Sequence, residues 1–231
     1  MKYKILIPGV LFFTFSYNII AQDCKMYFPD KEGATREMTS YDKKGKENGK
    51  VLQEIISKKV SQGNLEVTIK QTVMDKKGEG VTSNEFTGVC EGGIFRVSMA
   101  NYVDQSTLEA YKNMEIEMSG DNLAFPSDMK PGDQLKDGTY NMVVKNSGMT
   151  IITITISITD RKVLSKETLK TPAGSFECMK ISYSFTSKMG IVTIKSSALE
   201  WICEGVGVVK AESYSKNGSL MAYSELTKLK L

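Results

Sequence analysis

The sequence predicts a single mainly β domain, built as a strongly curved antiparallel sheet, and three observations support this prediction. Residues 150–159, TIITITISIT, alternate isoleucine with hydroxyl side chains, so one face of this strand is apolar and the other is polar. Glycine-ended polar turns separate further apolar runs, and only one interval has apolar residues at helical spacing. Strands with one buried and one polar face are typical of an antiparallel sheet that is covered on one side.

The alternation in residues 150–159 predicts which side chains enter the core. We expect Ile152, Ile154, Ile156 and Ile158 to face the buried side of the sheet, and Trp201 to be buried or to line a cavity. Ten other apolar or alternating runs predict strands: 36–41, 51–60, 65–74, 81–89, 94–99, 139–145, 176–186, 191–199, 206–214 and 220–226.

The turns support the same architecture independently. Residues 42–45 and 75–78 both read Asp-Lys-Lys-Gly, residues 215–218 have the same shape, and residues 145–148 are a looser relative. A polar first residue and a glycine that permits positive φ are typical of hairpins closed by a bulge. The strands between these turns do not repeat periodically, so the pattern favours a meander and not a solenoid.

One interval departs from the strand pattern. Leu108, Tyr111, Met114 and Met118 recur every three to four residues, which predicts a short helix from about 106 to 114 against the concave face of the sheet. Met118 also belongs to an alternation of apolar residues with glutamates, so the second half of this interval can instead be a strand. The loop at 125–132 contains two prolines and separates two parts of the chain, but it does not by itself make two domains.

Residues 1–21 have the pattern of a secretory signal peptide. Lys2 and Lys4 precede an apolar stretch at 5–15, and Ala21 offers a small residue for cleavage before Gln22. The apolar stretch is short for a bilayer span, and Asp23 disfavours lipid attachment at the following cysteine. We therefore predict one exported β-rich domain over 22–231, with no stable membrane span after processing.

Composition disfavours several classes of function. Without Lys2 and Lys4, 28 basic residues face 27 acidic ones, and this near-neutral balance gives no support for nucleic-acid binding. The chain has no histidine, which removes the usual general base and the usual neutral metal ligand. We predict no catalytic residues, no metal and no cofactor, and an enzyme is the least favoured class.

The four cysteines predict disulfides, because the chain is expected to be exported. Four cysteines allow three connectivities. If the strands at 176–186 and 191–199 form a hairpin that turns near residue 189, Cys178 lies opposite Cys203, which leaves Cys24 to pair with Cys90. Their wide spacing disfavours a metal or redox role.

Six of the 13 methionines fall between residues 99 and 149, and methionine adapts to varied apolar partners. One hypothesis is that this segment covers a lipophilic cavity, and the alternative is that it is ordinary core under a helix. The candidate ligand-lining residues are Met99, Leu108, Tyr111, Met114, Met118 and Trp201.

Two blocks, TPAGSFECMKI at 171–181 and EWICEGVGVVKAESYSKNG at 200–218, carry a family resemblance. The chain resembles the TapB-like family of exported Gram-negative proteins, which belongs to a larger family of unknown function. The resemblance implies an open or half-closed β-barrel, similar in outline to periplasmic lipoprotein carriers. It also implies a location in the periplasm or at the cell exterior, and it brings no catalytic or binding residues.

The favoured function is non-enzymatic binding of a lipophilic ligand or an exported polypeptide in the cell envelope. The alternative is an interaction or assembly factor whose exposed strand edge pairs with another envelope protein. A continuous apolar cavity would favour the first function, and a closed, dry core would favour the second. A perturbed carboxylate or lysine in a cleft would favour an enzyme.

Overall fold

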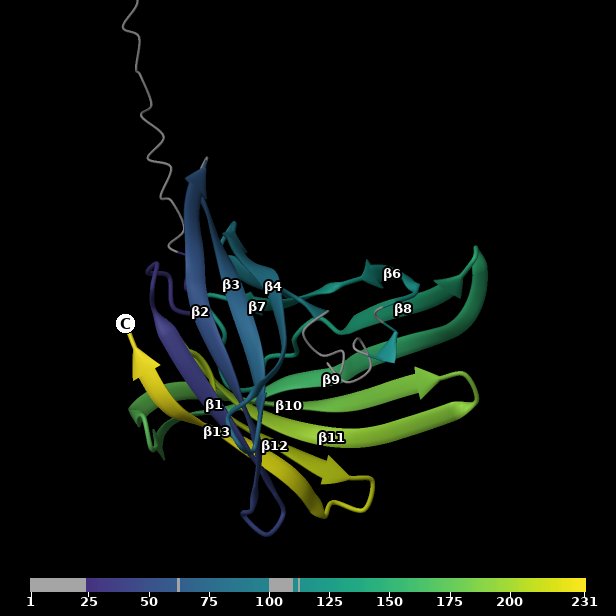
Figure 1. The fold of residues 1–231 in the computed structure, drawn as a ribbon. Helices are drawn as coiled ribbons and strands as arrows, with labels where there is room; N and C mark the ends of the chain where they lie inside the picture. The colour runs from purple at the N-terminus through teal and green to yellow at the C-terminus, as the bar shows by residue number, and fades with distance from the viewer. Residues whose placement is uncertain (1–23, 62, 100–109, 112) are drawn as a thin grey trace, which may run out of the picture.

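The computed structural model describes residues 24–61, 63–99, 110, 111 and 113–231, and these form one antiparallel sheet of thirteen strands (Figure 1). The strands are β1 Thr35–Asp42, β2 Glu47–Ser61, β3 Asn64–Asp75, β4 Gly80–Glu91, β5 Ile94–Ser98, β6 Glu115–Gly120, β7 Asn122–Pro126, β8 Gly138–Asn146, β9 Met149–Thr171, β10 Gly174–Met189, β11 Val192–Cys203, β12 Gly207–Ser215 and β13 Leu220–Lys230. Within these described ranges, no helix is long and apolar enough to cross a bilayer.

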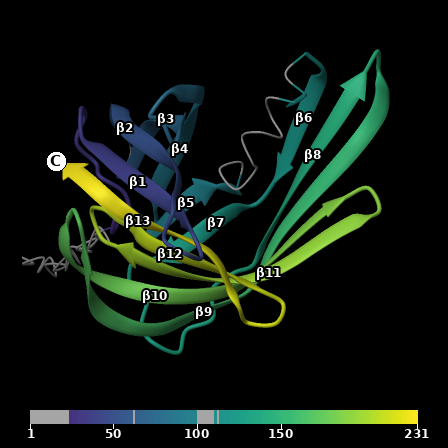
Figure 2. The same ribbon diagram turned by 60° about the horizontal axis from the view of Figure 1, so that its bottom comes forward.

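The sheet curls into a nearly closed barrel (Figures 1 and 2). Its strand order is β6-β8-β9-β10-β11-β12-β13-β1-β2-β3-β4-β5-β7, so the first and last strands of the chain pair in the middle of the sheet. The two edge strands, β6 and β7, are consecutive in the chain and are joined through Asp121. The backbone N–H of Asp121 donates to the carbonyl of Thr139 at 2.9 Å. The prediction of a curved antiparallel sheet that forms an open or half-closed barrel is confirmed.

The predicted turns form as expected. Gly45, Gly78 and Gly218 have φ values of 79°, 81° and 75°, which side chains other than glycine rarely adopt. In the first turn, Oδ1 of Asp42 accepts hydrogen bonds from the backbone N–H groups of Lys44 and Lys46. A polar first residue and a terminal glycine therefore close each of these hairpins.

Two strands differ from the prediction. Strand β9 continues to Thr171 instead of ending at residue 159, because Asp160 adopts a φ of 57° and the register with β10 shifts beside it. Such a bulge redirects a strand without ending it. Strand β7 occupies residues that were expected to begin a loop. Most of the helix predicted at 106–114 lies outside the described residues. Glu115–Gly120 after it is strand β6, which agrees with the strand alternative for this part of the chain.

The isoleucine alternation of β9 does place one face in the core. Ile154, Ile156 and Ile158 are at most 5% exposed, and Ile152 is half-buried against the same core. Thr155, between two of them, lies on the other face and donates to Oδ1 of Asn141 at 2.8 Å. The prediction that this face is buried is confirmed.

Replacing Ile154 with alanine is therefore expected to lower the free energy of unfolding by about 2–5 kcal/mol, through lost burial and a residual cavity. Thr155→Ala, the neighbouring control, loses one half-buried hydrogen bond and is expected to cost less than about 1 kcal/mol. Urea unfolding of both variants checks the difference. Equal losses would show that both faces of β9 are covered.

A polar cluster holds β1 against β13 on the outside of the sheet. The carboxylate of Glu37 accepts hydrogen bonds from Thr227 and Lys228, each at 3.1 Å. Burial acts to raise the pKa of Glu37, but the hydrogen bonds from Lys228 and Thr227 outweigh it and leave the pKa below its usual value. This cluster fixes the strand pair that brings the two ends of the sequence together.

Candidate functional site

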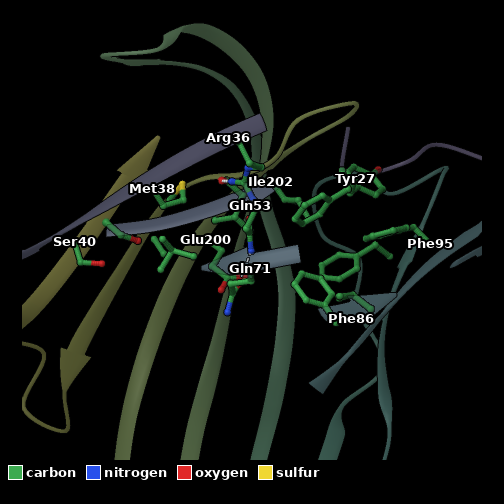
Figure 3. Close-up of a pocket in the computed structure, with 17 residues that line it drawn as sticks. Tyr27, Arg36, Met38, Ser40, Gln53, Gln71, Phe86, Phe95, Glu200 and Ile202 are labelled. Carbon is green, nitrogen blue, oxygen red and sulfur yellow. Dashed lines mark hydrogen bonds between the residues drawn. The ribbon is translucent and has the colours of Figure 1, made fainter. Parts of the chain in front are cut away.

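A cavity of about 310 Å³ lies on the concave side of the sheet, between β1–β5 and β11–β13, and we call it the inner cavity (Figure 3). Its volume is at the lower end of the range for small-molecule sites. Aromatic and aliphatic side chains make most of its wall: Tyr27, Phe28, Phe86, Phe95, Phe125 and Ile202. Polar side chains from β1, β2, β3 and β11 complete it: Arg36, Ser40, Gln53, Gln71 and Glu200.

The aromatic wall consists of two groups of rings, and the rings within each group contact one another. The ring centroids of Tyr27, Phe95 and Phe125 lie 6.0 to 6.3 Å apart, each pair tilted. Phe28 and Phe86 form an edge-to-face pair at 6.0 Å. Such pairs stabilise one another beyond the burial of their area. The wall is therefore a packed apolar surface drawn from segments that are distant in the sequence.

The segment before β1 carries Tyr27 and Phe28 and is tied down at several points. The disulfide Cys24–Cys90 attaches it to β4. The backbone N–H of Gly205 donates to the carbonyl of Met26 at 2.7 Å. These attachments, and not strand pairing, place two of the ring side chains on the cavity.

A Gly-Val-Gly turn at residues 205–207, between β11 and β12, makes room for the polar end of the cavity. Gly207 has a φ of 93°, and a Cβ atom there would lie 3.2 Å from Nη1 of Arg36 and 3.2 Å from the carbonyl oxygen of Tyr27. A side chain at this position would be strained and would crowd Arg36. The glycine thus lets the guanidinium pass close to the backbone of β12.

Arg36 lies at the start of a row of hydrogen-bonded side chains (Figure 3). Its Nη1 donates to Oε1 of Gln53 at 2.7 Å, and Nε2 of Gln53 donates to Oε1 of Gln71 at 2.6 Å. Its Nη2 donates to the carbonyl of Val208, and its guanidinium lies 5.0 Å from the ring centre of Phe28. The row runs across β1, β2 and β3 beside the aromatic wall.

Burial lowers the pKa of Arg36 to about 10 and raises that of Tyr27 to about 12, the latter with help from Glu204 and Asp128. Both groups therefore remain protonated near neutral pH. Glu200 lies on the opposite wall, where its Oε1 accepts from the hydroxyl of Tyr183 at 2.8 Å. The cavity thus combines an apolar wall with a cation, a carboxylate and neutral donors, an arrangement suited to binding an amphiphile.

The predicted cavity-lining residues that the structure describes do not line the inner cavity. Met99 is fully buried in the core, and Tyr111 packs on that core from its edge. Met114 and Met118 are 37% and 40% exposed. Leu108 lies outside the described residues. The inner cavity therefore has a different lining from the one that methionine content predicted.

Trp201 is buried, as predicted, but in a second cluster that does not contribute to the cavity lining. This cluster includes the disulfide Cys178–Cys203, so the structure contains the two predicted cysteine pairs. The indole Nε1 of Trp201 donates to Glu167 at 2.6 Å, which holds the pKa of that carboxyl below its usual value with a second hydrogen bond from Ser165. Strand neighbours point to opposite faces, which is why Ile202 lines the cavity and Trp201 does not.

Arg36 was not identified from the sequence as a buried residue that lines a cavity. The signal was present in the composition, because the chain has only three arginines against 27 lysines. Lysine serves a solvated surface, whereas arginine is suited to buried, multiply bonded positions. Two of the three arginines, Arg36 and Arg161, are almost fully buried. In a lysine-rich chain, each arginine was therefore a candidate for a buried role.

Comparison with known proteins gives a family and a fold. The chain matches the DUF3108-like family model over residues 31–226. It is similar to a protein of Bacteroides fragilis described as exported with a YmcC-like fold, at 29% identity and a TM-score of 0.75, over 90% of this chain and all of that one. A protein of Parabacteroides distasonis described as a lipoprotein shares the fold at 22% identity and a TM-score of 0.78, with the same coverage of both chains. No curated protein matches.

Proposed function

We propose that this chain, which belongs to the DUF3108-like family, is an exported, non-enzymatic envelope protein that binds a lipophilic ligand in the inner cavity. The single observation that carries this proposal is the cavity itself. Two groups of aromatic side chains line it on the concave face of the sheet. A largely apolar cavity with a few convergent polar groups is the usual form of a small-molecule site.

The descriptions of two similar proteins support export of this chain. The Bacteroides fragilis protein is described as exported and the Parabacteroides distasonis protein as a lipoprotein. The two disulfides, Cys24–Cys90 and Cys178–Cys203, fit an oxidising compartment outside the cytoplasm. The finer assignment to the TapB-like family within this group is part of the proposal, supported by the blocks at 171–181 and 200–218.

Binding is favoured over strand pairing by the state of the sheet edges. Strands β6 and β7 are only six and five residues long. On β7, the carbonyl of Ala124 accepts a hydrogen bond from Nη1 of Arg161 at 3.2 Å, so part of this edge is occupied within the chain. A short and partly covered edge is a poor template for an added strand.

An exported polypeptide that donates apolar side chains to the cavity is the second candidate ligand.

A thermal titration tests the proposal. The ligands are palmitate, phospholipids and acylated peptides, added to the purified protein. A ligand at about a hundredfold excess over its Kd stabilises by about 2.7 kcal/mol, so we expect a rise in Tm of roughly 5–10 °C for a domain of this size. Ala211→Trp, which fills the cavity from β12, is expected to abolish the rise.

The matched control is Met118→Trp, which introduces the same side chain at an exposed position of β6 and is expected to preserve the rise. Loss of the rise in Met118→Trp alone would move the binding site to the methionine-rich segment. A wild-type Tm that no member of the panel changes would eliminate ligand binding, and the strand-edge function would replace it.

A further inference from the structure

The inner cavity contains the buried guanidinium of Arg36, whose positive charge has no ion-pair partner within the described ranges. Arg36 is 4% exposed, and among the described residues no carboxylate forms an ion pair with it. Two of its N–H groups donate, to Gln53 and to the carbonyl of Val208, and its Nε is buried without an acceptor. Burial of a charge costs free energy unless an opposite charge or sufficient hydrogen bonds offset it.

Burial alone does not distinguish Arg36, because Arg161 is equally buried. The guanidinium of Arg161 stacks 4.7 Å from the ring centre of Phe125 and donates to the carbonyls of Ala124 and Lys136. These bonds join the edge strand β7 to the segment before β8, so Arg161 has a structural role. Arg36, by contrast, lines a cavity that is large enough for a ligand.

The hydrogen-bonded row from Arg36 has a fixed direction. Arginine can only donate, so Gln53 must present its amide oxygen to Arg36 and its amide nitrogen to Gln71. Gln71 must then accept with its oxygen, which leaves its Nε2 as the last donor of the row. Gln71 is 7% exposed and lines the cavity, and within the described part of the chain its Nε2 has no acceptor. The polar end of the cavity therefore offers N–H donors and a positive charge.

From this arrangement, and resting on the proposed function, we propose that the ligand is a single-chain amphiphile with one negative charge on its head group. The head group lies at the polar end of the cavity and accepts a hydrogen bond from Nε2 of Gln71, at the far end of the row that begins at Arg36, while the chain lies on the aromatic wall. The anion offsets the charge of Arg36, and charge-assisted hydrogen bonds are stronger than neutral ones. A cavity of about 310 Å³ favours one acyl chain over two.

Glu200 limits the charge of the head group. Its carboxylate lines the same cavity and is held by the hydroxyl of Tyr183. A second negative charge on the ligand would be repelled by it. A fatty-acid carboxylate and the phosphodiester of a lysophosphatidylglycerol both carry the single charge that this site accepts.

Calorimetric titration of the full mature protein with four probes of equal chain length tests the proposal. The probes are palmitate, palmitoyl lysophosphatidylglycerol, hexadecanol and hexadecyltrimethylammonium. We expect at least one anionic probe to bind tenfold or more tightly than hexadecanol, and the ammonium probe to bind most weakly. The order of the two anionic probes identifies the head group as carboxylate or phosphodiester, and either order supports the proposal.

Three variants locate the effect. Gln71→Leu retains Arg36 and its bond to Gln53. It is expected to lower the affinity for the anionic probe about tenfold and to change the affinity for hexadecanol little. Glu200→Gln is expected to raise the affinity for the anionic probe, because it removes a negative charge from the cavity. Arg36→Gln removes the charge and is expected to abolish the preference for the anion. Because this variant can fail to fold, Gln71→Leu and Glu200→Gln decide the question without it.

The outcomes separate the two proposals. Equal affinity of the wild type for hexadecanol and the anionic probes would overturn the head-group assignment and leave lipophilic binding intact. An unchanged preference in both Gln71→Leu and Glu200→Gln would also overturn it. Absence of binding by all four probes would overturn the proposed function as well.

Discussion

Replacing Phe95 with alanine is expected to lower the free energy of unfolding by about 3–5 kcal/mol. The side chain is 1% exposed and touches Tyr27 and Phe125, so its loss removes the centre of the aromatic wall. Urea unfolding measures the loss, and ligand titration of the still-folded variant measures the effect on binding. A loss below about 1 kcal/mol would show that the wall does not depend on this ring.

Gly88 provides a sharper control for the same site. A Cβ atom at Gly88 would lie 2.8 Å from Cε2 of Phe95, so Gly88→Ala alone is expected to destabilise the protein by crowding. In the Phe95→Ala background the crowding atom is absent, and the same change is expected to cost much less. A double-mutant cycle therefore gives a coupling between the two positions. Additive costs would contradict the packing described here.

Removal of the disulfide Cys24–Cys90 by a double change to serine is expected to cost about 2–4 kcal/mol and to abolish ligand binding. The loss of stability follows because a disulfide constrains the unfolded chain and its removal releases that constraint. The loss of binding follows because this disulfide attaches the segment that carries Tyr27 and Phe28 to β4. Denaturant unfolding and palmitate titration measure the two effects separately.

The disulfide Cys178–Cys203 is the matched control, because it lies in the cluster around Trp201 and not on the cavity. It spans 25 residues against 66 for the first bridge. If chain entropy alone acts, its removal costs about 0.9 kcal/mol less. Its removal is expected to preserve binding at temperatures where the protein is folded. Equal loss of binding in both double variants would show that global stability controls the site.

The strands were predictable because the information for them is local. The alternation of Ile154 with Thr155 and the glycine at the end of each turn act over a few residues, and both appear in the structure as predicted. The single-sheet barrel required in addition the family resemblance, since the residue pattern specifies faces and turns without specifying which strands pair across the sheet.

The inner cavity was not predictable in this way, because its parts are distant in the sequence. Phe95 and Ile202 meet only through the sheet topology, and Tyr27 joins them through the attachments of the segment before β1. Bulges also shift the register of β1 with β13 beside Glu37, and of β11 with β12 beside Trp201. A shift of one residue exchanges the two faces of a strand, so the facing of side chains beyond a bulge does not follow from alternation.

The pairing of β1 with β13 has a consequence for the order in which the molecule folds. Thr35 pairs with Lys230, about 195 residues later (230 − 35). Closing so long a segment carries a large entropic cost, and sheets rich in distant contacts fold slowly. Hairpins such as β2–β3 and β9–β10 need only adjacent strands and can form while synthesis continues. The inner cavity needs side chains from β1 and from β11 to β13, so it is completed only after the last strand has been made.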